Sequence, residues 1–382
     1  MAQSAHAYVR GSTERFYEWL TSTKTKQLPS GPPIWICGDS HVSNLGPVAN
    51  AEGKVEIAVR DLDQTVIGNP AHDLIRLALS LATAARGSDL PGVITAQMLE
   101  AMSGGYERGV LHPSFRPQKT SRIEPIELVF RQALKRKWRH LAEERIADIS
   151  PTIPKGKCFW PLAKRENREM KHLFQTENVR KLVTCLNQRD DNDEIEIADA
   201  AYWMKGCSSL GKLRYAVLVR VGKKQKGIAG FCLVDIKEAT ATAAPRLPAA
   251  AMPRDNAQRI VTGAKNLSPF LGGRMLAAQL CGRSVFMREL MPQDLKLEIE
   301  ELDCDQAIAI AGYLAQVLGR AHGRQMTGAT RRAWTKLIRS RRSKTIDAPS
   351  WLWRSVVDLI ALHEKAYLDH CRRYALQNAQ NQ

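Results

Sequence analysis

The stretch Cys37-Gly38-Asp39-Ser40-His41-Val42-Ser43-Asn44, followed by Val59-Arg60-Asp61-Leu62-Asp63, decides the fold expected for this chain. The apolar residues before Gly38 predict a short buried strand that enters a polar loop, and the alternating residues before Asp61 predict a second strand. Phosphoryl transfer from ATP requires a carboxylate beside the accepting hydroxyl and oxygen ligands for Mg²⁺. The carboxylates and the amide of these two stretches are groups of this kind, although Asp and Asn are also common as turn and cap residues.

The first stretch resembles the H-G-D-x-H-x-x-N loop of aminoglycoside and choline kinases, with Cys37 in place of the first histidine. Residues 59–74 are similar to the I-D-x-x-x-A-x-x-G-D-P-x-x-D-L run of the same kinases. The resemblance implies that Asp39 is the catalytic carboxylate, which orients or deprotonates the acceptor hydroxyl. It gives His41 a place in the catalytic loop, where bracing the loop is favoured over proton transfer.

The same resemblance implies a metal site. In these kinases an amide on the loop and the first acid of the second run bind magnesium, which assigns Asn44 and Asp61 as metal ligands. Asp63 is expected to assist them. The last acid of the run, Asp73, is expected to support the catalytic loop.

Phosphate-binding elements come after the loop, not before it as in other kinases. The turn Gly206-Cys-Ser-Ser-Leu-Gly211 stands between two predicted strands, and residues 234–239 resemble the V-A-I-K strand of kinases. The resemblance implies that amides at Ser208, Ser209 and Gly211 contact the β- and γ-phosphates and that Lys237 neutralises the α- and β-phosphates. Alone, the turn is equally typical of a hairpin, and the lysine of a surface strand.

Residues 285–292 resemble the strand and hinge whose backbone receives adenine, which would assign Glu289 and Leu290 to nucleotide binding; a plain buried strand is the alternative. A helix is expected over residues 256–267. It contains no acid that could pair with Lys237, so the acidic partner of this lysine is left open.

These observations predict an α+β chain with a protein-kinase-like, two-lobed and circularly permuted fold. The expected segments are the catalytic-loop and metal-binding part of the C-lobe over 1–104, a helical insertion on the acceptor side over 105–193, the ATP-binding β-rich N-lobe over 194–293, and the helical remainder of the C-lobe over 294–382.

From about residue 6 to residue 375 the chain resembles the uncharacterised bacterial domain-of-unknown-function family 2252. Its marker segments include Tyr8-Val9-Arg10-Gly11, Lys237-Glu238-Ala239 and Arg288-Glu289-Leu290. The family implies kinase-like character. For Arg10, a functional role and a helix-flanking role are both open.

Composition limits the remaining classes. Of 382 residues 44% are hydrophobic and 25% are charged, which is typical of a folded chain, and no uninterrupted apolar run is long enough to span a bilayer. We therefore expect a cytoplasmic protein without a membrane partner. The net charge of +17 makes a nucleic-acid partner possible, but the basic clusters are more typical of solvated helix faces.

The leading hypothesis is an ATP- and Mg²⁺-dependent phosphotransferase that acts on a hydroxyl of a small acceptor. One alternative is transfer of the nucleotide as AMP by the same residues. Another is a catalytically silent, nucleotide-dependent binding protein with a basic surface. The sequence identifies neither the acceptor nor the oligomeric state.

Overall fold

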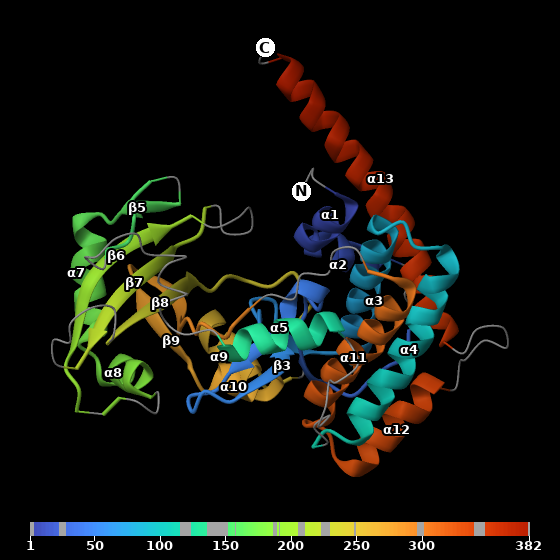
Figure 1. Cartoon of the computed structure of the whole chain (residues 1–382), viewed down its shortest axis with the longest axis horizontal. Helices are drawn as coiled ribbons and strands as arrows, with labels where there is room; N and C mark the ends of the chain where they lie inside the picture. The colour runs from blue at the N-terminus through green and yellow to red at the C-terminus, as the bar shows by residue number, and fades with distance from the viewer. Residues whose placement is uncertain are drawn as a thin grey trace.

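The computed structural model describes residues 4–22, 28–114, 124–135, 152–156, 158–185, 189–190, 192–204, 211–222, 230–247, 250–295, 302–339 and 348–380. It is a mixed α+β structure. A six-stranded sheet forms one end of the molecule and a group of helices forms the other, with two small hairpin-like sheets and the helices α5, α9 and α10 between them (Figure 1).

The helical end is built around α3, whose residues 71–85 are nearly all buried. Asn69 caps this helix by accepting a hydrogen bond from the Ala71 amide, and Pro70 occupies the first helical position, where no amide donor is needed. The helices of this end are α1 (Ala5–Gly11), α2 (Thr13–Thr21), α3 (Pro70–Gly87), α4 (Gly92–Leu111), α11 (Cys304–Gly323), α12 (Gly328–Arg339) and α13 (Ser350–Gln380).

Close packing of α4 on α11 requires glycine. A Cβ added at Gly105 would lie 2.0 Å from the Gly312 carbonyl oxygen, and one at Gly319 would lie 2.3 Å from the Tyr106 carbonyl oxygen. The two helices therefore approach backbone to backbone. This contact connects the 92–111 segment to a helix some 200 residues later in the chain.

The large sheet is antiparallel throughout, in the order β5-β6-β7-β8-β10-β9. Helices α7 (Lys164–Phe174) and α8 (Glu177–Thr184) cover its outer face through an apolar cluster. The predicted strands within 194–293 are confirmed. The strands are β5 (Phe159–Pro161), β6 (Ile195–Trp203), β7 (Arg214–Val221), β8 (Phe231–Glu238), β9 (Met275–Leu280) and β10 (Arg283–Glu289).

The 105–193 segment differs from the expected helical insertion on the acceptor side. Its strand β5 pairs with β6, and α7 and α8 pack on the large sheet, whereas α5 (Glu124–Lys135) lies near the β2–β3 hairpin. The segment thus divides between the sheet and the centre of the molecule. The apolar faces of α7 and α8 are buried against the large sheet.

Between the two ends lie the elements that the opening stretch of sequence predicted. Strand β1 (Ile34–Ile36) pairs with β4 (Val66–Gly68), and β2 (Leu45–Ala49) pairs with β3 (Val55–Val59). A short 3-10 turn, η2 (Val42–Asn44), joins β1 to β2, and α9 (Asn256–Leu267) and α10 (Pro269–Gly272) pack nearby. None of the helices in the described ranges has the length and apolar character of a bilayer-spanning segment.

Candidate active site

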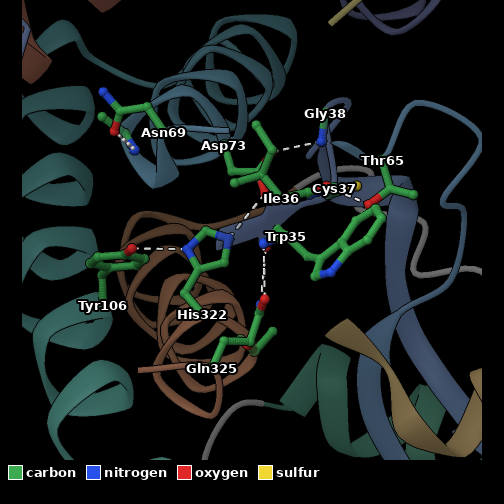
Figure 2. Close-up of polar contacts among 12 residues, drawn as sticks. Trp35, Ile36, Cys37, Gly38, Thr65, Asn69, Asp73, Tyr106, His322 and Gln325 are labelled. Atoms are coloured by element: carbon green, nitrogen blue, oxygen red, sulfur yellow. Dashed lines mark hydrogen bonds and ion pairs between the residues drawn. The ribbon is translucent and has the colours of Figure 1, made fainter. Parts of the chain in front are cut away.

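Residues 37–44, hereafter the Asp39 loop, are held by Asp73 at the start of α3. The two carboxylate oxygens of Asp73 accept hydrogen bonds from the amides of Cys37 (2.7 Å) and Gly38 (2.9 Å), as Figure 2 shows for Gly38. The contact expected between Asp73 and the loop is therefore present. The side chain of Asp73 is 1% exposed, so these bonds are made away from water.

A buried chain of polar side chains continues from Asp73 into the helical end. His322 Nε2 lies 3.1 Å from Asp73 and His322 Nδ1 lies 2.8 Å from the Tyr106 hydroxyl (Figure 2). Trp334 Nε1 donates to the same hydroxyl. Helices α4, α11 and α12 thereby support the carboxylate that holds the Asp39 loop. His322 and Tyr106 were not predicted as part of the site, because nothing in their local sequence distinguishes them from core residues of a helix.

Asp39 is partly buried and its two oxygens have different surroundings. Oδ1 accepts a hydrogen bond from Arg76 Nε at 2.9 Å, whereas Oδ2 lies 3.9 Å from His41 Nε2, beyond ordinary hydrogen-bond distance. The side chain remains 16% exposed. Asn44 is tied to the same loop, because its Nδ2 donates to the Asp39 carbonyl oxygen at 2.9 Å.

His41 is a buried neutral imidazole. Burial lowers the pKa of His41 to about 4, and this outweighs the neighbouring Asp39 carboxylate, which acts in the opposite direction. The ring is 6% exposed. A ring with so low a pKa is a weak proton acceptor at physiological pH, which fits the bracing role better than proton transfer.

The second loop brings two carboxylates to a lysine of the large sheet. Lys237 Nζ, on β8, lies 3.8 Å from Asp61 Oδ2 and 3.6 Å from Asp63 Oδ2. The acidic side chains are 43% and 44% exposed, whereas that of Lys237 is 14% exposed. The partner of Lys237, which the helix at 256–267 could not supply, therefore comes from the loop after β3.

The pKa values of the two acids are shifted in opposite directions. Burial opposes ionisation of Asp61, but the Lys237 ammonium and the contact with Asp63 outweigh it and hold the pKa of Asp61 well below its usual range. Burial and the Asp61 charge raise the pKa of Asp63 to about 6. Carboxylates this close repel each other when both are ionised, so a bound cation would relieve the repulsion.

Two contacts join the acid pair to the Asp39 loop. The Arg60 amide donates to the Asn44 carbonyl oxygen at 2.8 Å, and the Cys37 thiol lies 3.4 Å from the Asp61 carbonyl oxygen. Asp39, Asn44 and Asp61 thus belong to adjoining loops. Their nearness was predicted from the spacing of the opening stretch.

Arg259 of α9 holds the loop that carries Asp63. This fully buried side chain donates from Nη1 to the Thr65 carbonyl and from Nη2 to the carbonyls of Asp63 (3.1 Å) and Thr240 (3.0 Å). Thr240 follows the lysine strand. The helix without an acid therefore contributes an arginine that ties the acid loop to the Lys237 strand.

Some of the other residues predicted to contact the nucleotide lie outside the described residues, and one points away from Lys237. Ser208 and Ser209 lie outside the described residues, whereas Gly211 begins the described part of this turn with φ of +75°. Glu289 pairs with Arg189 at 2.6 Å and 2.9 Å, and its register partner Val234 belongs to the outer-face cluster. The Glu289 carboxylate is therefore not brought to Lys237.

The hinge backbone is also engaged. The Glu289 carbonyl accepts from Arg274 Nη1 at 2.9 Å, and the Leu290 amide donates to the Leu233 carbonyl at 2.8 Å. Adenine contact at the Leu290 amide would have to replace that bond. The Leu290 side chain packs with the apolar cluster that includes Ala216 and Leu218.

The donor set of the acid loop fits magnesium. Within the described ranges no group of three or more His, Cys, Asp or Glu side chains could hold a metal ion alone. Mg²⁺, however, commonly uses one or two carboxylates and completes its shell with water and phosphate. Asp61 and Asp63 could supply the carboxylates, and Oδ1 of Asp63 is buried without a hydrogen-bond partner among the described residues.

The family model described as an uncharacterized protein conserved in bacteria, DUF2252, matches residues 1–373. The chain belongs to the DUF2252 family. Comparisons with curated proteins and with solved structures gave no match. The DUF2252 match spans the Asp39 loop, the acid pair and the Lys237 strand, so all parts of the candidate site belong to the family region.

Proposed function

We propose that this protein is an ATP- and Mg²⁺-dependent phosphotransferase with a circularly permuted kinase-like arrangement. The observation that carries the proposal is the meeting of Lys237 with Asp61 and Asp63, which come from segments more than 170 residues apart. A strand lysine and loop carboxylates that converge beside a second carboxylate loop are the parts that phosphoryl transfer requires. In this account ATP lies between the inner face of the large sheet and the two loops.

In this proposal different residues bind the metal, bind the phosphates and position the acceptor. Asp61 and Asp63, with the side-chain oxygen of Asn44, hold Mg²⁺, which when bound neutralises charge on the phosphates. Lys237 orients the phosphate chain. The amides near Gly211 are proposed to cover the phosphates. Arg76 and Asn44 hold Asp39 so that Oδ2 faces the acceptor hydroxyl.

The proposed reaction forms a bond between the acceptor oxygen and the γ-phosphorus. The bond between that phosphorus and the β,γ-bridging oxygen breaks, and ADP leaves with the electron pair. The acceptor's proton goes to Oδ2 of Asp39. Arg76, which donates to Oδ1, orients the carboxylate for this transfer.

Transfer of labelled phosphate tests the proposal. The protein is incubated with the small-molecule fraction of a bacterial extract and with ATP labelled at either the γ- or the α-phosphate. We expect γ-label in a small product, and Asp39→Asn should reduce transfer about 100-fold or more without loss of MgATP binding. Asp369→Asn, an exposed change on α13, is the matched control.

Each other outcome contradicts the proposal in a different way. Full transfer by Asp39→Asn would refute the role of Asp39. Transfer of α-label would instead support the nucleotidyl transferase alternative. MgATP binding without transfer of either label would favour the silent binding protein.

A further inference from the structure

Arg288 lies on β10 beside the candidate phosphate site, and the proposed function leaves it without a role. In the β8–β10 pairing Phe286 is opposite Lys237 and Arg288 is opposite Asp235. Because alternate residues of a strand share a face, Arg288 is on the same inner face of the sheet as Lys237. Diagonal neighbours across an antiparallel pair are within reach of long side chains.

The contacts of Arg288 leave part of its guanidinium available. Nη1 donates to the Arg60 carbonyl at 3.1 Å, which directs the side chain to the residue immediately before Asp61. Nε is buried and has no hydrogen-bond partner among the described residues. The side chain is half-buried, and its charge acts on the carboxylates of Asp61, Asp63 and Asp235.

The neighbouring charges show why another cation is needed here. Lys237 already faces two carboxylates, and Asp235 is neutralised by a bidentate pair with Arg214 at 2.9 Å and 2.7 Å. A triphosphate adds several negative charges to this surface. Arg214 is fully engaged by Asp235 and Lys237 shares its charge with two carboxylates, whereas Arg288 is bonded only to a neutral carbonyl in the described structure.

We infer that Arg288 is a second phosphate-binding cation of the site, which donates to non-bridging oxygens of the nucleotide's phosphate chain. The inference rests on the proposed function and deepens it. Arginine suits this position because its fork can keep the bond to the Arg60 carbonyl and still present donors to a phosphate. The bond would also link nucleotide binding to the backbone that positions Asp61.

Isothermal titration of wild type and Arg288→Gln with MgATP and with adenosine tests the inference. We expect the variant to bind MgATP about 10- to 100-fold more weakly, because a charge-assisted hydrogen bond is lost, and to bind adenosine as wild type does. Arg220→Gln is the matched control, since Arg220 is on the same sheet at the opposite end of β7 from Arg214. It should bind MgATP unchanged.

The outcomes separate the inference from the proposed function. If wild type binds MgATP and Arg288→Gln binds it equally well, or loses adenosine in parallel, Arg288 is not a phosphate ligand, whereas the proposed function stands. If wild type does not bind MgATP, the proposed function and the role of Arg288 are both refuted. If Arg288→Gln does not fold, Arg288→Lys is measured in its place. A folded Arg288→Lys protein whose MgATP affinity is within about tenfold of wild type supports the charge role, and total loss of MgATP binding contradicts it.

Discussion

Gly38 occupies a position in the Asp39 loop that no other residue can take without strain. Its φ is +77°, and an added Cβ would lie 2.1 Å from the Gln64 carbonyl oxygen. Gly38→Ala should lower the free energy of unfolding by about 2–5 kcal/mol, because a left-handed backbone and a backbone clash combine. Denaturant unfolding measures this change.

Gly53→Ala is the control for backbone conformation alone. Gly53 has φ of +74° but nothing within 4 Å of an added Cβ. This variant should lose only about 1 kcal/mol. Equal losses for the two variants would show that the approach of Gln64 does not constrain the loop.

Asp63 makes the site's stability depend on pH. Since the pKa of Asp63 is raised to about 6, its contribution to stability is fully present below pH 4 and is lost as the pH rises through 6. Asp63→Asn removes this loss, so without Mg²⁺ the variant should gain up to about 1 kcal/mol over wild type at pH 7.5, a small value because the side chain is only partly buried. Near pH 4 the gain should vanish.

Thermal unfolding at the two pH values, with and without Mg²⁺, checks this prediction. Mg²⁺ should stabilise wild type more than Asp63→Asn, because the cation relieves the carboxylate repulsion only where both acids are present. A variant that is less stable than wild type at pH 7.5 without Mg²⁺ would refute the raised pKa. Equal stabilisation by Mg²⁺ would remove Asp63 from the metal site.

For single residues, the sequence predicted the site residues that lie within one short motif. It did not predict the residues from distant segments that hold them in place. The contacts of Asp39, Asn44 and Asp73 follow from spacing within a few dozen residues. Arg76, Arg259 and His322 act through burial and through partners on other segments. No local pattern marks such residues, because the same types at the same spacing are common on ordinary helices.

Helix α9 links the acid loop to the sheet, and its Arg259 is the element's main polar contact. Arg259→Met should fold with about 3 kcal/mol less stability, since three carbonyls lose the donor that this buried side chain supplies. It should also bind MgATP more weakly, because the Asp63 loop is no longer held. Chemical denaturation and nucleotide titration give the two values.

Arg246→Met provides the comparison for this helix. Arg246 is exposed, and its guanidinium makes only a 3.4 Å contact with Asn256 in the described structure. Neither stability nor MgATP affinity should change in this variant. A stable Arg259→Met protein with unchanged affinity would show that α9 is not required to position the acids.

Elements with strong local signals were predicted well. The helix expected at 256–267 is α9. Strand β5 was missed, because three residues are too few to establish an alternating pattern. Its pairing with β6 is decided by tertiary contacts rather than by local sequence.

At the scale of the whole molecule, the candidate site depends on contacts between segments that are distant in sequence. Loops from the first 80 residues meet a sheet built from residues 159–289, and helices from residues 256–267 and 304–323 support them. The contact between these loops and the sheet was predicted only from the resemblance to kinases. The outer-face position of the Glu289 carboxylate depends on strand register, which the residue pattern left open.

Calorimetric titration of ATP, with and without Mg²⁺, into wild type and Asp61→Asn measures whether the acid loop and Lys237 form a MgATP-binding site. We predict binding that requires Mg²⁺ in wild type and that weakens about tenfold or more in Asp61→Asn, because the variant loses a metal ligand beside Lys237. A wild-type protein that ignores ATP in the presence of Mg²⁺, or an Asp61→Asn protein that binds MgATP as tightly as wild type, would contradict it.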